Sequence, residues 1–300
     1  MESENKDEGG AIVGINLKIT PVIAETMIQQ TKYVANLSIW KQYMIWRYTL
    51  GSGQLNMLLI GIPDETRLRY WVRQFFELYN IQRYGLNAIE MPFNQWSSHF
   101  TNPGLVQNDN IDTCKKIVAN FAWILSRIII NAPIAQHEDF LLYKASSVYN
   151  SEMKRLLTEP LKANEVVRVP QLLFNSTSYD PEFEFNTFVA DSGDSVLWML
   201  TRRTNIPCLF INPIFHAYPH EREFLLPPGC IFNIRDVRDV QLEYVNKSDF
   251  KLEVVQEAPY VIGEVYRYLG QPSTGVKPMK LFVADIEYSK QISEEIKKLI

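Results

Sequence analysis

The stretch HAYPHEREFLLPPGCIF, residues 216–232, contains the pattern on which the fold prediction depends. Two glutamates, Glu221 and Glu223, flank Arg222 and directly precede an apolar run that ends at a Pro-Pro-Gly turn. In an extended strand the two carboxylates would share one face, with Cα atoms about 7 Å apart. Such a pair raises the pKa of one member and stabilises a cation that develops nearby. The alternative is a solvated strand start with two surface glutamates, which the spacing alone favours because short motifs match by chance.

A second polar cluster lies upstream, in LLFNSTSYDP (172–181). It places Ser176, Thr177 and Ser178 at the end of a predicted strand. Hydroxyl groups at a strand end can hydrogen-bond a neighbouring carboxylate and fix its rotamer. Taken alone, the segment is equally an ordinary turn rich in serine and threonine.

A third segment, FLLYKASS (140–147), is an apolar strand that reaches Tyr143 and Lys144 before small residues follow. A lysine at a strand end can bind a phosphate or ribose oxygen as a compact point charge. The commoner fate of a lysine is to face solvent, and this alternative stays open.

Length and composition describe an ordinary globular chain. The 300 residues are 46% apolar and 21% charged, which suffices for one large domain or two smaller ones. A net charge of −4 without a long basic block disfavours binding to nucleic acid. Three scattered cysteines predict no disulfide framework and indicate a reducing compartment.

Neither a signal peptide nor a membrane span is expected, so we predict a cytoplasmic protein. The N-terminus, MESENKDEGG, lacks the basic and apolar parts of a signal peptide. The most apolar stretch, residues 117–130, is short for a bilayer and is interrupted by Asn120 and Arg127, which favours a buried helix.

The pattern of apolar residues divides the chain into a helical part and a strand-rich part. Helices are predicted at 20–50, 63–80, 109–130, 147–158 and 289–300. Strands are predicted at 140–145, 169–177, 206–212, 223–226, 230–237, 251–256 and 279–285. We therefore predict an α+β protein with a disordered tail (1–12), a helical domain (13–132) and a strand-rich domain (133–300).

Taken in order, the three motifs resemble those of the mono-ADP-ribosyltransferases typified by cholera toxin, the C3-like and actin-modifying bacterial toxins, and the vertebrate ecto-enzymes. That family has an aromatic-Arg pair at a strand end, a Ser-Thr-Ser strand, and Glu-x-Glu before an apolar strand, often followed by a Leu-Pro-x-Gly type of turn. The resemblance covers about residues 138–290 and implies a mixed, β-sandwich-like ADP-ribosyltransferase fold after the helical part. The matching segments are Tyr143-Lys144, Ser176-Thr177-Ser178, and Glu221-Arg222-Glu223 before FLLPPG.

The resemblance implies a role for each acidic and hydroxyl residue. Glu223 would be the catalytic glutamate, which binds the nicotinamide-ribose hydroxyl of NAD and stabilises the oxocarbenium-like state as nicotinamide leaves. Glu221 would position or deprotonate the acceptor. Ser176 would orient Glu223, and Thr177 and Ser178 would support the strand; all three would help to bind NAD.

The resemblance also implies the remaining contacts to NAD. Tyr143 and Lys144 would bind the co-substrate, and Phe188, or the neighbouring Phe183 or Phe185, would stack on nicotinamide. Lys144 stands where the family has arginine; it keeps the charge but loses the planar fork that binds two oxygens at once. No metal is required, and the four histidines, which lack ligand spacing, are interpreted as loop residues.

The family also implies a protein target. Phe215 and Tyr218 would contact it, and a glutamate at position 221 goes with arginine as the acceptor. The predicted activity is therefore that of an NAD⁺–protein-arginine ADP-ribosyltransferase, in a toxin-like effector of bacterial or viral type. By analogy with toxin relatives, the helical part is a candidate module for docking a partner.

Two alternatives stay open. Because Lys144 replaces an arginine, the chain is also a candidate for a weak or inactive relative that uses the fold for binding or scaffolding. Alternatively, it is an NAD glycohydrolase that transfers the ribosyl group to water.

Overall fold

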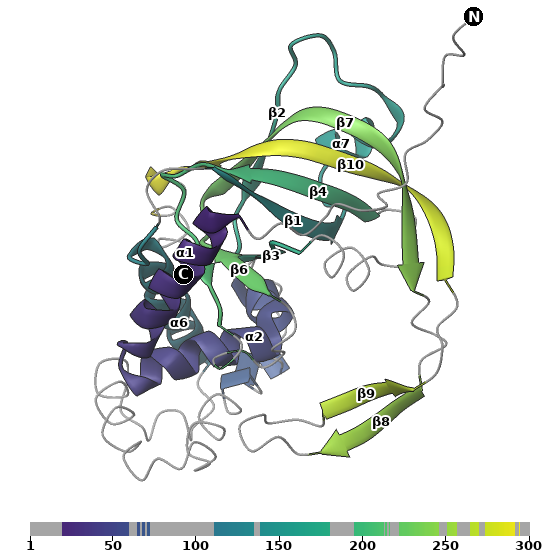
Figure 1. Ribbon diagram of the computed structural model, residues 1–300. Helices are drawn as coiled ribbons and strands as arrows, with labels where there is room; N and C mark the ends of the chain where they lie inside the picture. The colour runs from purple at the N-terminus through teal and green to yellow at the C-terminus, as the bar shows by residue number, and fades with distance from the viewer. Residues whose placement is uncertain are drawn as a thin grey trace, which may run out of the picture.

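A mixed eight-stranded sheet, with the helices of the N-terminal part of the chain gathered on one side of it, forms the body of the computed structural model (Figure 1). The structure describes residues 20–59, 65–66, 68–69, 71–72, 111–134, 139–180, 195–212, 214, 216, 222–245, 251–256, 265–269, 274–291 and 294. The helices are α1 (Pro21–Ala35), α2 (Ile39–Leu59), α6 (Ile111–Ile130) and α7 (Ser151–Thr158). The strands are β1 (Phe140–Ser147), β2 (Val167–Gln171), β3 (Asn175–Ser178), β4 (Ser195–Arg202), β5 (Leu209–Phe210), β6 (Glu223–Leu226), β7 (Cys230–Val245), β8 (Lys251–Gln256), β9 (Val265–Leu269) and β10 (Thr274–Tyr288).

The strands of the large sheet follow the order β2-β7-β10-β4-β1-β3-β6-β5. Its neighbouring strands are antiparallel except for β4 and β10, which run parallel. The long strands β7 and β10 run together beyond the body of the sheet toward the hairpin of β8 and β9 (Figure 1). The predicted α+β class, a helical first part followed by a mixed sheet, is confirmed.

The helix predictions are partly confirmed. Helix α6 matches the prediction for 109–130, whereas the single helix predicted at 20–50 is divided at residues 36–38 into α1 and α2. Helix α1 begins where it does because the Thr20 hydroxyl accepts a hydrogen bond from the Ile23 amide at 3.3 Å, which satisfies a free donor of the first turn. Much of the segments predicted as helices at 63–80 and 289–300 lies outside the described residues.

The strand predictions for 223–226 and 251–256 coincide with β6 and β8. The single strand predicted at 169–177 is wrong: it is two strands, β2 and β3, which lie in different parts of the sheet. The chain leaves one strand at Gln171 and starts the next at Asn175, and the Asn175 side chain donates to the Leu173 carbonyl at 2.9 Å in the bend. Strands β4 and β9 were not predicted.

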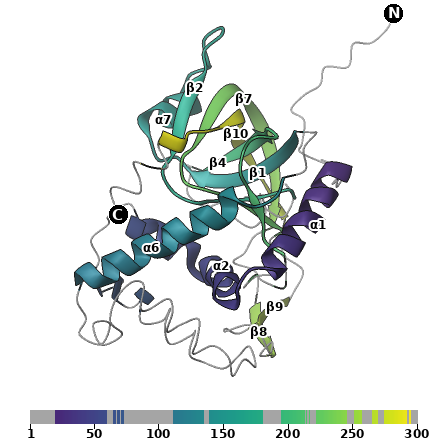
Figure 2. The same ribbon diagram turned by 90° about the vertical axis from the view of Figure 1, so that its left-hand side faces the viewer.

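The helices and the sheet share a hydrophobic core. Phe121 of α6 and Trp71 pack in one buried cluster with Leu209 of β5 and Leu225 of β6. Both views show α1, α2 and α6 together on the same side of the sheet (Figures 1 and 2). The division of the chain near residue 132, and a docking role for its helical part, stay predictions.

One buried side chain, Gln30 of α1, ties the helices to β5. Its amide nitrogen donates to the carbonyls of Pro133 and Cys208, both at 2.8 Å, and its oxygen accepts from the Phe210 amide at 2.5 Å. Because the side chain is fully buried, no water is available to replace it. The contact therefore fixes the position of α1 on the edge of the sheet next to β6.

We expect Gln30→Leu to lower the free energy of unfolding by about 2–3 kcal/mol, since the change leaves a buried amide and two carbonyls without their partner. Urea unfolding followed by circular dichroism measures the loss. The matched control is Gln29→Leu on the same helix, where the amide bonds only to exposed Glu25; it should change stability by less than about 0.5 kcal/mol. Equal effects of the two substitutions would contradict the role of Gln30.

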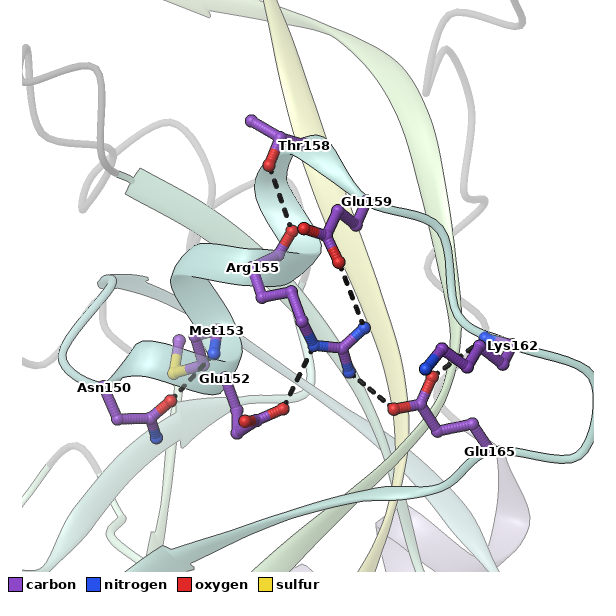
Figure 3. A network of polar contacts seen from close by, with 8 residues as sticks. All are labelled: Asn150, Glu152, Met153, Arg155, Thr158, Glu159, Lys162 and Glu165. Carbon is purple, nitrogen blue, oxygen red and sulfur yellow. Dashed lines mark hydrogen bonds and ion pairs between the residues drawn. The ribbon is translucent and has the colours of Figure 1, made fainter.

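A polar network fixes α7 to the loop that leads into β2 (Figure 3). Arg155 donates to Glu152 at 3.2 Å and to Glu165 at 2.6 Å. A backbone hydrogen bond from Lys162, with Arg155 beside it, lowers the pKa of Glu165. The network lies at the surface, so its contribution to stability is small, and its effect is to set the course of the loop.

Among the described helices, none combines the length and the apolar character needed to cross a membrane. The cysteines Cys114, Cys208 and Cys230 are all buried as thiols. Desolvation by burial raises the pKa of Cys208 and Cys230, which keeps both as neutral, poorly reactive thiols.

Candidate functional site

The sheet brings the three motifs found in the sequence onto neighbouring strands. Strand β3 pairs antiparallel with β1, where Ser178 lies opposite Tyr143, and with β6, where Ser178 lies opposite Glu223. Residues directly opposite each other in an antiparallel pair have side chains on the same face, with Cβ atoms about 5 Å apart. Tyr143, Ser178 and Glu223 therefore form one row across three strands, although the segments are far apart in the sequence.

Two hydroxyls of β3 fix the backbone on both sides of Glu223. Thr177 donates its hydroxyl hydrogen bond to the Phe224 carbonyl at 2.6 Å, and Ser178 donates to the Arg222 carbonyl at 3.3 Å. Both residues are buried, so these bonds replace water that is excluded from the site. They hold the backbone of β6 against β3 on both sides of Glu223.

The backbone turns sharply immediately before β6. Arg222 has φ = 49°, in the left-handed region that non-glycine residues seldom occupy. Its guanidinium is ion-paired with the carboxylate of Asp180, which lies two residues after the end of β3. The sequence predicted one extended strand through Arg222, with side chains pointing alternately to its two faces. Because Arg222 has a left-handed backbone, the regular strand begins only at Glu223.

The carboxylate of Glu223 is buried and bonded to a histidine. The Nε2 atom of His216 lies 2.8 Å from Oε2 of Glu223, and the two side chains are 1% and 4% exposed. His216, expected from the sequence to be a loop residue, does lie in the loop between β5 and β6, and its ring is turned toward Glu223. No spacing rule links a loop histidine to a strand seven residues later, so the sequence contains no signal for this contact.

The first motif is placed on β1 beside β3. Tyr143 is buried, and desolvation raises the pKa of its phenol, so it stays neutral near pH 7. The next residue, Lys144, is half-buried and donates from Nζ to the Ser176 carbonyl at 3.1 Å. Because the β1–β3 ladder consists of the single pair Tyr143–Ser178, the lysine satisfies a carbonyl where the ladder ends.

The helical part also contacts the second motif, and the sequence pattern does not predict this contact. The hydroxyl of Tyr48, on α2, lies 3.4 Å from Oγ of Ser176. The neighbouring Phe174 carbonyl accepts from the Asn56 side chain of the same helix at 3.1 Å. Helix α2 therefore packs on the strand that carries the predicted NAD-binding hydroxyls.

Several predicted site residues are not brought together in the described part of the chain. The register partner of Ser176 is Leu225 and that of Ser178 is Glu223, so the serine opposite the carboxylate is not the one expected. A role for Ser176 in orienting Glu223 stays a prediction. The predicted residues that lie outside the described part are Glu221, Phe183, Phe185, Phe188, Phe215 and Tyr218.

The described part of the site holds the buried carboxylate of Glu223, the hydroxyls of Thr177 and Ser178, and on β1 the ammonium group of Lys144, which donates to the Ser176 carbonyl. Within the described residues, no group of three or more His, Cys, Asp or Glu side chains is arranged to hold a metal ion. A carboxylate fits a ribose hydroxyl or a developing sugar cation, and a lysine fits a phosphate. The residues present therefore suit a sugar-phosphate ligand such as a dinucleotide.

Comparison with known proteins finds likeness to solved structures, whereas no family model and no curated protein matches the chain. It is similar to Plx2a, an ADP-ribosyltransferase toxin from Paenibacillus larvae, with 13% identity over 88% of this chain and 94% of that chain and a TM-score of 0.46. It is similar to an ADP-ribosyltransferase from Clostridium botulinum, with 12% identity, coverage of 89% and 96%, and a TM-score of 0.43. It is also similar to Vis toxin, an ADP-ribosyltransferase from Vibrio splendidus, with 10% identity, coverage of 90% and 82%, and a TM-score of 0.43. At these values the likeness alone defines neither the activity nor the target of this chain.

Proposed function

We propose that the chain is an NAD-dependent mono-ADP-ribosyltransferase that transfers ADP-ribose to a protein side chain, with arginine as the expected acceptor. The observation that supports this most strongly is the strand register, which joins the three sequence motifs in one row at Tyr143, Ser178 and Glu223. Motifs that matched by chance would have no reason to lie on adjacent strands.

The residues of the site suit the chemistry of this reaction. Nicotinamide is a good neutral leaving group, so cleavage of its glycosidic bond needs little proton transfer. It needs a negative group close to the ribose and firm positioning of both substrates. Glu223 supplies the negative charge, while Thr177 and Ser178 hold its backbone in place.

The test is incubation of a cell lysate with labelled NAD, in which wild type is compared with Glu223→Gln. A labelled protein band that depends on Glu223 supports the transferase. Free ADP-ribose without a labelled protein would select the NAD glycohydrolase alternative. If neither a labelled protein nor free ADP-ribose forms at saturating NAD, both enzyme activities are contradicted. The binding or scaffolding protein is then the remaining alternative.

Lys144 decides between the transferase and an inactive relative. We expect Lys144→Met to raise KM for NAD about tenfold or more, because it removes the charge proposed to bind a phosphate or ribose oxygen but keeps the apolar stem. Steady-state NAD cleavage measures the change. Lys154→Met, on the exposed side of α7, is the control and should leave KM unchanged. Equal KM values for wild type and Lys144→Met would show that Lys144 does not bind NAD.

A further inference from the structure

The contact between His216 and Glu223 is closed off from solvent. An ionised carboxylate can only accept hydrogen bonds, so the histidine donates from Nε2, which lies 2.8 Å from Oε2. Burying a carboxylate without a partner is costly, and both side chains are almost fully buried. Within the described part of the chain, His216 makes the one hydrogen bond to this carboxylate.

The loop that carries His216 is braced before it reaches the site. The Ile211 amide donates to the Glu223 carbonyl at 3.0 Å. Asn212 donates from its side chain to the Thr31 hydroxyl of α1 at 3.2 Å and accepts from the Ile214 amide at 3.0 Å. The imidazole is therefore presented to Glu223 from a backbone that is fixed to both β6 and α1.

The nearest cation in the sequence does not neutralise Glu223. Arg222 is ion-paired with Asp180, which lies two residues after the end of β3. The carboxylate of Glu223 is thus held by a histidine, and its Oε1 atom receives no hydrogen bond from any described residue.

We propose that His216 is a positioning residue, which fixes the rotamer of Glu223 so that Oε1 meets the ribose hydroxyl of NAD. This inference rests on the proposed function of Glu223. The role requires a hydrogen-bond donor at the place of Nε2, and it requires no proton transfer. Loss of the donor would leave the carboxylate free to rotate, which weakens the transition state more than it weakens the binding of NAD.

The test compares His216→Leu with His216→Gln, because the glutamine amide nitrogen can donate from nearly the same place as Nε2. We expect kcat for NAD cleavage to fall about 10- to 100-fold in His216→Leu, with KM for NAD within about threefold of wild type. His216→Gln should recover at least about tenfold of the lost kcat. Ile214→Ala, an exposed site in the same loop, is the control and should retain the kcat of wild type.

A spectroscopic measurement covers the case in which His216→Leu does not fold. In protein labelled with ¹⁵N-histidine, Glu223→Gln should shift the His216 Nε2 resonance, which is identified by its absence in His216→Gln. An unshifted resonance would contradict the contact itself. Wild-type kcat in folded His216→Leu, or a higher kcat, would overturn the positioning role, the latter because the histidine would then block the carboxylate. Wild type that cleaves no NAD would instead contradict the proposed function.

Discussion

Glu223→Gln is expected to lower kcat for NAD cleavage by about 100- to 1,000-fold, the range found when one electrostatic group that stabilises a transition state is removed. The glutamine keeps the shape of the side chain and an oxygen that accepts from His216, at 2.8 Å in the wild-type pair. It removes the negative charge that would stabilise the sugar cation. The release of nicotinamide from purified protein, measured over a range of NAD concentrations, gives kcat and KM separately.

The split between kcat and KM identifies the role of the charge. Because the amide can still bond to a ribose hydroxyl, KM should change by less than about threefold, while kcat carries almost the whole effect. Glu159→Gln is the matched control: Glu159 is an exposed carboxylate at the end of α7, far from β6 in the sequence, and its loss should leave both constants unchanged. A Glu223→Gln protein that is folded and retains more than about a third of the wild-type kcat would exclude Glu223 as the catalytic carboxylate.

The parts of the site that sequence reasoning predicted are those with a strong local signal. Strand β6 is a short apolar run between charged residues and a Pro-Pro-Gly turn, and its predicted bounds of 223–226 are those observed. The hydroxyls of Thr177 and Ser178 stand out in the sequence and support Glu223 through backbone carbonyls. Their place next to β6 follows from the resemblance and could not be derived from spacing, since strand order is a tertiary property.

The parts that were missed depend on contacts between distant segments. His216 and Tyr48 are an ordinary loop histidine and an ordinary helix tyrosine until the loop and α2 fold against β6 and β3. Arg222 adopts a left-handed backbone conformation although it is not a glycine. Its ion-pair partner, Asp180, lies 42 residues earlier in the sequence. No local propensity predicts a left-handed residue at this position, so the sequence alone does not show that the regular strand begins at Glu223.

Strand β4 is the clearest error of omission, because it lies inside the sheet. Its sequence, SVLWMLTR, is an apolar run that follows DSGD, which is typical of a strand buried on both faces. It pairs with β1 on one side and with β10 on the other. Without it, the motif on β1 has no connection to the β2-β7-β10 half of the sheet.

Trp198→Ala in β4 is therefore expected to lower the free energy of unfolding by about 3–5 kcal/mol, the range for a large aromatic residue lost from a core. Trp198 is 1% exposed. Its ring lies 5.3 Å from that of Phe232 on β7 and 5.1 Å from that of Phe282 on β10, and its Nε1 donates to the Ser146 hydroxyl of β1 at 2.9 Å. The alanine leaves a cavity between β4 and the three strands that Trp198 contacts, and the close-packed neighbours fill it only in part.

Trp123→Ala provides a control of the same residue type, because this tryptophan on α6 is 45% exposed. Its loss should cost less than about 1 kcal/mol. Urea unfolding followed by circular dichroism gives the midpoint for each variant. The midpoints can be compared directly if the dependence of the free energy of unfolding on urea concentration is the same for both, because an equal slope shows that both expose the same surface on unfolding. Strand β4 pairs with β1, which carries the first motif, and with β10. Loss of Trp198 should therefore disturb the site as well, so Trp198→Ala should lose NAD cleavage at a lower temperature than Trp123→Ala does. Similar unfolding midpoints for the two variants would contradict the packing of Trp198 in the core between β4 and its neighbouring strands.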